Sequence, residues 1–145
     1  MSIDFTIQER IELIINFYDS YGYIAETIDE FPIAKKFVTA GYAELNENNV
    51  YVKNKQGALF LHETIMQISM GLVSKMKSNG WSMPMDEMLP WFISEYQLTD
   101  YEIGSSIKDY ILKNIDVYGY KIYLSHRKNR YILEKIISNW IQNCK

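Results

Sequence analysis

One hydrophobic pattern constrains this 145-residue chain more than any other feature, and it runs from about Ala58 to Lys77. Apolar residues recur there at intervals of three or four positions, which is the spacing of one face of an α-helix. We therefore expect a long helix with one buried face. That face comprises Leu61, Ile65, Ile68, Leu72, Val73 and Met76.

A second helical signal lies near the start of the chain. Thr6 and Glu9 have the spacing of a capping box, in which each side chain bonds the backbone of the other residue at a helix N-terminus. This helix is expected to end near Tyr21–Gly22. Its apolar face is expected to hold Ile7, Ile11, Ile14, Ile15 and Tyr18.

Between these two helices the sequence predicts several smaller elements. A short helix is expected over Ile24–Ile28 and another over Pro32–Thr39, because the fixed φ of proline suits a first helical turn. Ala40–Gly41 should end the second of these helices. Two extended segments around an Asn-rich turn then predict a β-hairpin. The strands, the turn that joins them and the turn before the long helix are expected at Tyr42–Leu45, Val50–Lys53, Asn46–Asn49 and Asn54–Gly57.

After the long helix, Ser78–Gly80 has the composition of a linker. It divides the chain into residues 1–78 and 81–145, as two small units or as parts of one compact domain. Beyond it we expect a turn or broken helix that is bracketed by Pro84 and Pro90 and continued by Trp91–Tyr96. A helix should then run from a Thr99/Glu102 capping box to about Lys113, followed by a strand over Val117–Ser125 and a basic turn at His126–Asn129. The chain should close with a helix that carries Leu133, Ile136, Ile137, Trp140 and Ile141. The predicted class is mostly α with small β-hairpins, an α+β fold.

The sequence contains no motif that carries catalytic chemistry. There is no Gly-rich phosphate loop, no nucleophile elbow, no CxxC and no HExxH. The two histidines, His62 and His126, lie far apart in the sequence, and the single cysteine, Cys144, has no neighbouring base. We therefore expect a protein that is not an enzyme and that uses no cofactor and no metal.

Composition bears on the compartment and on the partner. One cysteine, no positive segment leading into an apolar run at the start and no long apolar stretch predict a cytoplasmic protein without a membrane span. The net charge is −3 and the isoelectric point is about 5.4, whereas nucleic-acid-binding domains are usually basic. The acids are concentrated in the first half. Residues 1–72 hold 5 basic and 10 acidic residues, and residues 73–145 hold 10 basic and 8 acidic residues.

From Pro32 to about Met66 the pattern resembles a winged helix-turn-helix module. The resemblance rests on the run Phe37–Tyr42, on Glu44–Leu45, on Val50–Val52 and on Lys55–Leu59. In that family a helix ends at a glycine step, a hairpin wing follows and a glycine opens the next helix. The resemblance implies that Pro32–Thr39 is the recognition helix. A degenerate second copy would use Thr99–Lys113 as its recognition helix and Tyr118–Tyr131 as its wing.

If the chain reads DNA, the resemblance implies basic contacts near each recognition helix and wing. The acids that flank the first recognition helix, among them Glu44 and Glu47, would repel phosphate and oppose this reading. The candidate DNA contacts are Lys35, Lys36, Thr39, Lys53 and Lys55 in the first half, and Lys108, Lys121, Arg127, Lys128 and Arg130 in the second.

The competing hypothesis is an inhibitor of the immunity or antitoxin type that binds a basic protein, such as a nuclease toxin. The segment from Phe17 to Phe31 interleaves aromatic residues with carboxylates. Aromatic side chains anchor protein interfaces, and acids attract a basic partner and speed the encounter. Alternatively, the tyrosines fill the core and the acids form a solvated face. The candidate contacts are Tyr18, Asp19, Tyr21, Tyr23, Glu26, Asp29 and Glu30. The sequence leaves the oligomeric state open.

Overall fold

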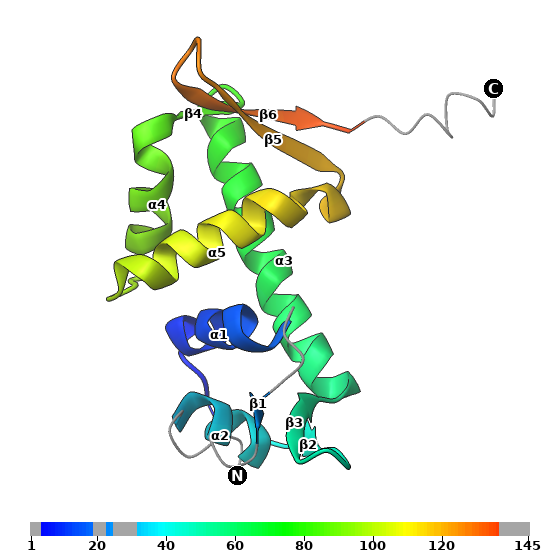
Figure 1. Cartoon of the computed structure of the whole chain (residues 1–145). Helices are drawn as coiled ribbons and strands as arrows, with labels where there is room; N and C mark the ends of the chain where they lie inside the picture. The colour runs from blue at the N-terminus through cyan, green and yellow to red at the C-terminus, as the bar shows by residue number, and fades with distance from the viewer. Residues whose placement is uncertain (1–3, 19–22, 25–31, 137–145) are drawn as a thin grey trace, which may run out of the picture.

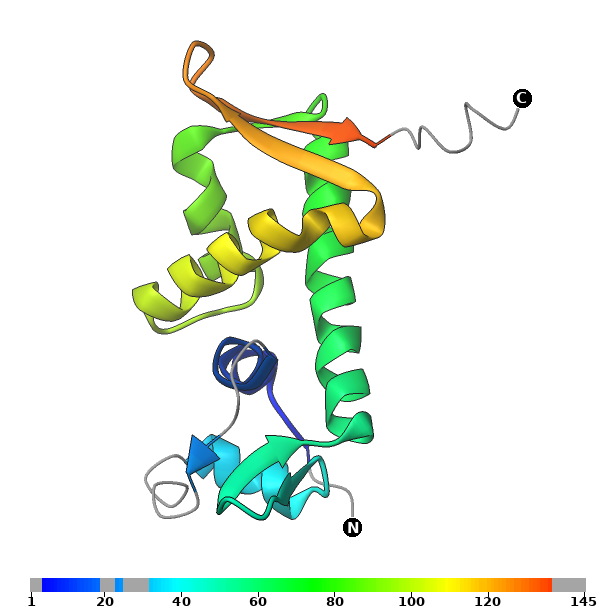
Figure 2. The same cartoon turned by 45° about the vertical axis from the view of Figure 1, so that its right-hand side comes forward.

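The computed structural model describes residues 4–18, 23–24 and 32–136. The chain is mostly helical with two small antiparallel sheets, as the sequence predicts. The sheets lie at opposite ends of the molecule, and the long helix α3, Lys55–Ser78, runs from one to the other (Figure 1). Helices from both halves of the chain pack along α3 between the sheets, so that it forms the axis of the fold (Figure 2).

The predicted apolar face of α3 is confirmed, since all six of its members are buried. The helix begins three residues before the predicted start, and the turn expected at Asn54–Gly57 is wrong. The Asn54 side chain accepts a hydrogen bond of 2.8 Å from the Gly57 N–H, which caps the helix there. A helix capped in this way begins at Lys55, because one of its first free donors is already satisfied.

The first helix, α1, spans Ile7–Leu13 and has the predicted Thr6/Glu9 capping box. It continues as a π-helical turn, η1, over Ile14–Tyr18. The wider π turn changes the buried face from the one that an α-helical spacing predicts. Leu13 and Phe17, which the sequence analysis did not assign to the core, are fully buried with Ile11 and Ile14. The predicted end at Tyr21–Gly22 lies outside the described residues.

The first sheet contains β1 (Tyr23–Ile24), β2 (Ala43–Leu45) and β3 (Val50–Lys53), in the order β1-β3-β2. The predicted hairpin is confirmed by β2 and β3. The helix α2, Pro32–Thr39, has the predicted bounds, and the predicted stop follows it at Ala40–Gly41, where Gly41 has a φ of +86°. A helix beginning at Ile24 is wrong, because Ile24 pairs with Val50 in the sheet. Residues 25–28 lie outside the described residues.

The second sheet has the same kind of order, β4-β6-β5. Its helices are α4 and α5, which lie between β4 and the hairpin of β5 and β6 in the sequence. The elements are β4 (Ser82–Pro84), η3 (Met85–Glu87), α4 (Met88–Glu95), α5 (Tyr101–Asn114), η4 (Ile115–Tyr118), β5 (Tyr120–Ser125) and β6 (Arg130–Lys135).

Three predictions in this half are wrong, and each error can be traced to particular residues. The helix α5 is capped by Asp100, whose carboxylate accepts from the Glu102 N–H, whereas Thr99 bonds Gln8 instead. The strand begins at Tyr120 because the preceding residues form the 3₁₀ turn η4, which ends at Gly119 with a φ of +85°. The expected closing helix is replaced at Leu133 by β6, which hydrogen-bonds to strands on both sides. Ile137, Trp140 and Ile141 lie outside the described residues.

The buried hydrophobic side chains form one cluster that includes residues from α1, α2, α3, α4, α5 and β6. An aromatic group lies near the first sheet, where Tyr42 stacks on Phe60 at 4.7 Å and Phe37 lies 5.4 Å from Tyr42. No helix among the described residues is long and apolar enough to cross a membrane.

A substitution at Gly57 tests whether the close approach of α3 to the first sheet stabilises the fold. A Cβ at this position would overlap the carbonyl oxygen of Tyr42 and touch the Phe37 ring. Gly57→Ala should therefore lower the free energy of unfolding by about 1–3 kcal/mol, although alanine is normally the better helix former. Urea unfolding measures the change. Gln56→Ala, at an exposed position in the same turn, should change stability by less than about 0.5 kcal/mol, and an equal loss in both variants would contradict this account.

Candidate functional site

The acidic segment that the sequence singles out is only partly described. Asp19, Tyr21, Glu26, Asp29 and Glu30 lie outside the described residues, whereas Tyr18 ends η1 and Tyr23 lies in β1. One member of the segment is corrected. Phe17 is fully buried with its ring 5.0 Å from that of Phe37, so it is a core residue and cannot anchor a partner.

The short strand β1 places two residues of this segment, Tyr23 and Ile24, in the first sheet. Ile24 pairs with Val50, which is the first residue after the turn of the β2–β3 hairpin. Glu44 and Glu47 are exposed on that hairpin, and Leu45 between them is 48% exposed. Ile24 therefore lies in the same sheet as this hairpin, with β3 between it and the strand β2 that carries Glu44 and Leu45.

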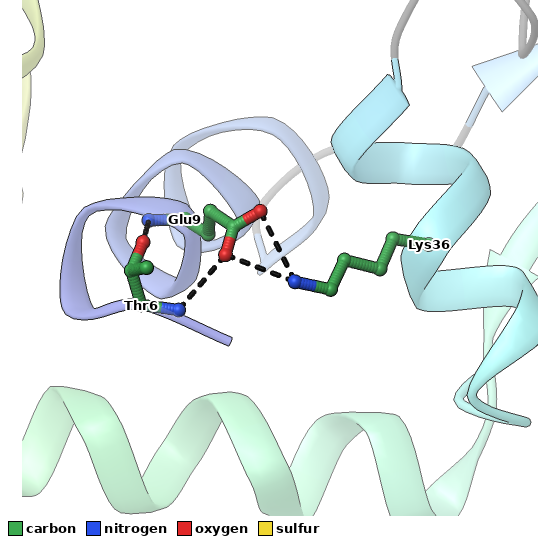
Figure 3. A network of polar contacts seen from close by, with 3 residues as sticks. All are labelled: Thr6, Glu9 and Lys36. Atoms are coloured by element: carbon green, nitrogen blue, oxygen red, sulfur yellow. Dashed lines mark hydrogen bonds and ion pairs between the residues drawn. The ribbon is translucent and has the colours of Figure 1, made fainter. Parts of the chain in front are cut away.

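Lys36, a candidate DNA contact on α2, is engaged within the protein. Its Nζ lies 3.1 and 3.3 Å from the two carboxylate oxygens of Glu9 and 4.7 Å from the centre of the Phe5 ring. Glu9 also accepts from the Thr6 N–H at 2.8 Å, so that α1, its cap and α2 are joined by one polar network (Figure 3). A phosphate could recruit Lys36 only by breaking this network.

The other first-half candidates differ in their surroundings. Lys53 on β3 donates to the carbonyl oxygen of Phe17 at 3.0 Å, which ties the sheet to η1. Lys35 on α2 and Lys55 at the start of α3 are exposed, as is Thr39. Lys36 and Lys53, the two first-half candidates that are not exposed, thus both make hydrogen bonds within the protein.

In the second half, the basic residues near the β5–β6 turn differ in their exposure and in their contacts. Arg127 and Lys128 are exposed in the turn itself. Arg130 lies on β6, half-buried, and its Nε donates to the Ser82 Oγ at 2.9 Å, which joins β6 to β4. Lys108 forms an ion pair with Asp109, and Lys121 lies over the Tyr123 ring. Arg127 and Lys128 are therefore presented to solvent in the predicted basic turn, whereas Arg130 is held against β4.

The helix α5, which the resemblance assigns to DNA reading, packs against the first half of the chain. The Thr99 N–H before α5 donates to Gln8 Oε1 on α1 at 2.9 Å. A shallow polar hollow between the two helices is lined by Glu12, Asp100 and Glu102 among others. Burial, together with the charges of Glu9 and Asp100, raises the pKa of Glu12. Sequence reasoning missed this carboxylate-rich contact because its members come from residues about 90 positions apart.

The two histidines lie in different parts of the fold. His62 lies on α3 with its ring stacked at 6.2 Å from Tyr118, whereas His126 lies in the exposed β5–β6 turn. Within residues 4–18, 23–24 and 32–136 no group of three His, Cys, Asp or Glu side chains is arranged to hold a metal ion. Burial, with a smaller contribution from Glu95, raises the pKa of Tyr96 to about 12, so its hydroxyl stays protonated.

No family model, no curated protein and no solved structure matches this chain.

The Glu9 network makes a prediction about pH. Burial raises the pKa of Glu9, but hydrogen bonds from Thr6 and the Lys36 ammonium outweigh it, so the net pKa is lowered. A carboxyl whose pKa falls on folding stabilises the protein above its unfolded pKa, and this contribution is lost as the pH falls through the lowered value. Glu9→Gln should therefore cost about 0.2–1 kcal/mol at neutral pH and nothing in acid. Urea unfolding across pH measures the difference.

Glu12→Gln is the matched variant, one turn along the same helix, and should act with the opposite sign. Because the pKa of Glu12 is raised, its charge opposes folding at neutral pH, and the variant should be more stable than the parent there. The gain should shrink as the pH falls through the raised pKa and vanish below the ordinary value of 4.5. A loss of stability in both variants at neutral pH would contradict the opposite roles assigned here to the charges of Glu9 and Glu12.

Proposed function

We propose that this protein is a non-catalytic inhibitor that binds a basic protein partner, such as a nuclease toxin, and neutralises it by covering its active surface. The contact surface is the acidic end of the molecule. It comprises the segment holding Asp19, Tyr21, Glu26, Asp29 and Glu30 together with Tyr18, Tyr23 and the exposed hairpin residues Glu44, Leu45 and Glu47.

The observation that carries this proposal is the pairing of β1 with β3. It places Tyr23 and Ile24, which belong to the acidic segment of the sequence, in the same sheet as the hairpin that carries Glu44 and Glu47. The proposal takes the carboxylates of that segment to act together with Glu44 and Glu47. The cations that would offset them are partly withdrawn, because Lys36 binds Glu9 and Lys53 binds the Phe17 carbonyl. The surface therefore combines local negative charge with an exposed apolar side chain, which suits a basic protein partner.

A nuclease is a fitting partner because an enzyme that binds the phosphate backbone must present cations in its substrate groove. A protein that covers such a groove needs exposed carboxylates to match those cations, and it needs no chemistry of its own. Complementary charge also speeds the encounter, which matters for an inhibitor that must reach its target before the substrate does.

A second candidate is a winged-helix DNA-binding regulator. The two halves support it because each places a strand, a helix or helix pair and a hairpin in the same order, with strand orders β1-β3-β2 and β4-β6-β5. The exposed Arg127 and Lys128 would be the wing contacts. Against it, α5 presents Glu102 and Asp109 to solvent and borders α1, which leaves few cations on that helix to meet phosphate.

The two candidates are separated by a pull-down with tagged protein from a lysate of the source organism, at two salt concentrations, with and without nuclease treatment. The inhibitor proposal predicts a basic protein that is retained after nuclease treatment. The regulator proposal predicts DNA that is recovered in its place and lost steeply as salt rises, since each phosphate contact releases counterions. Recovery of salt-sensitive DNA without a protein partner would refute the inhibitor proposal.

Charge variants then locate the surface. Asp29→Lys with Glu30→Lys should abolish retention of the basic protein, and Glu44→Lys with Glu47→Lys should weaken it. Glu63→Lys, at an exposed position on α3, adds the same charge per substitution elsewhere and should leave retention intact. Arg127→Ala with Lys128→Ala should matter only if DNA is the ligand, and Arg130 is left in place because it bonds Ser82.

A further inference from the structure

The second sheet has one face toward the core and one face toward solvent. Side chains alternate along a strand, so Met83 on β4 and Leu133 on β6, which are 1% and 2% exposed, mark the inner face. Their neighbours along the strands mark the outer face, and the strand pairing places Ser82, Ile132 and Tyr123 in one row across it. In both views the helices lie on the inner side of this sheet, and no described element covers the outer face (Figure 1 and Figure 2).

The hairpin that forms most of this sheet is strongly basic. Residues 120–135 hold 5 of the 15 Lys and Arg residues of the chain but only 1 of its 18 Asp and Glu residues. Lys121 is exposed on β5, and Arg127 and Lys128 are exposed in the turn that joins β5 to β6. Charges are screened over about 8 Å at physiological salt, so the acids near the first sheet hardly reduce this local positive charge.

An exposed aromatic ring lies among these cations. Tyr123 is 38% exposed, and its hydroxyl donates to Glu134 Oε1 at 3.0 Å, which holds the ring across β5 and β6. The Lys121 Nζ lies 5.6 Å from the centre of the same ring. Ile132, which pairs with Tyr123, is half-buried and adds apolar surface beside the ring. A ring held in this way can stack a nucleic-acid base while neighbouring cations bind the phosphates on either side.

The acids of this end of the molecule restrict where a phosphate can bind. Asp86 and Glu87 are exposed on η3, which follows β4. Because the strand order is β4-β6-β5, β4 and β5 form opposite edges of the sheet. Glu134 is bonded to the Tyr123 hydroxyl. The positive charge is therefore best placed over β5 and the turn.

We propose that a single-stranded nucleic acid binds the outer face of the second sheet, with a base stacked on Tyr123 and phosphates bound by Lys121, Arg127 and Lys128. A single strand is favoured over a duplex because its bases are free to lie on a ring, whereas the bases of a duplex already stack on one another. The site uses neither recognition helix of the regulator candidate. It also does not rest on the inhibitor proposal, because the first sheet lies at the other end of the molecule (Figure 1).

Fluorescence anisotropy with the purified full chain tests this site. The probe is a fluorescein-labelled DNA of mixed sequence and about 12 nucleotides, used as a single strand or annealed to its complement. The single strand should bind about tenfold more tightly than the duplex. Tyr123→Ala should weaken single-strand binding about tenfold, because the stacked base loses its ring.

Two further tyrosine variants separate stacking from other effects. Tyr101→Ala removes a ring that is 68% exposed on α5 and should change the affinity less than about twofold. Tyr123→Phe keeps the ring and loses the bond to Glu134, so it should also bind within about twofold of the parent. A loss in Tyr123→Phe as large as that in Tyr123→Ala would show that the hydroxyl, and not stacking, matters.

Charge variants test the phosphate contacts. Arg127→Ala with Lys128→Ala should make the plot of log affinity against log salt shallower by about 1.4, because each phosphate contact of a single strand contributes about 0.7 to the slope. Lys55→Ala with Lys113→Ala removes two exposed cations from other parts of the fold and should leave the slope unchanged.

Four results would overturn the proposal. The first is no binding of the single strand at low salt, and the second is equal affinity for single strand and duplex, which would favour the regulator candidate. The third is an equal affinity of Tyr123→Ala and Tyr101→Ala. The fourth is competition by phosphatidylserine vesicles as effective as that by unlabelled single strand, which would assign the face to a membrane surface. None of these results involves a basic protein partner, so each leaves the inhibitor proposal standing.

Discussion

The buried face of α3 is the constraint on which the rest of the structure depends. Each of its large apolar side chains contributes about 1.5–3 kcal/mol when it leaves water. The elements that cover this helix come from both halves of the chain, since α3 contacts α1, η1 and β3 on one side of the sequence and β4, α5, η4 and β6 on the other. Neither sheet could hold its position without α3, because two or three short strands are marginal alone. The proposed acidic surface therefore depends on the same helix as the second hairpin.

The parts of the fold that follow from local sequence were predictable, and the parts that depend on distant partners were not. The capping box of Thr6 and the bounds of α2 are properties of a few consecutive residues, and both are confirmed. The strands β1 and β6 form because β3, β4 and β5 supply hydrogen-bonding partners elsewhere in the chain. Leu133 fits a helical pattern equally well, and only the neighbouring strands decide otherwise. Tertiary pairing overrides local preference in such segments.

The sequence was equally unable to show which basic residues are available to bind phosphate. From the sequence, Lys36, Lys53 and Arg130 were equivalent to the other basic residues as possible phosphate contacts. Their partners Glu9, the Phe17 carbonyl and Ser82 lie 27, 36 and 48 positions away, so no local pattern could have revealed the bonds. A cation with a short internal hydrogen bond must give it up before it can bind an external anion. A count of lysines and arginines therefore overstates the basic surface of this protein.

Exposed acidic and basic residues lie far apart along α3, so the net charge of the chain says little about the charge that a partner meets. The hairpin with Glu44 and Glu47 and the turn with Arg127 and Lys128 belong to the two sheets at opposite ends of the molecule (Figure 1). Twenty-four helical residues between them span about 36 Å, whereas charges are screened over about 8 Å at physiological salt. A partner at one end therefore responds to the local charges and hardly to the total of −3. The exposed carboxylates of Glu44 and Glu47 and the exposed basic turn can therefore coexist on one small chain without cancelling each other.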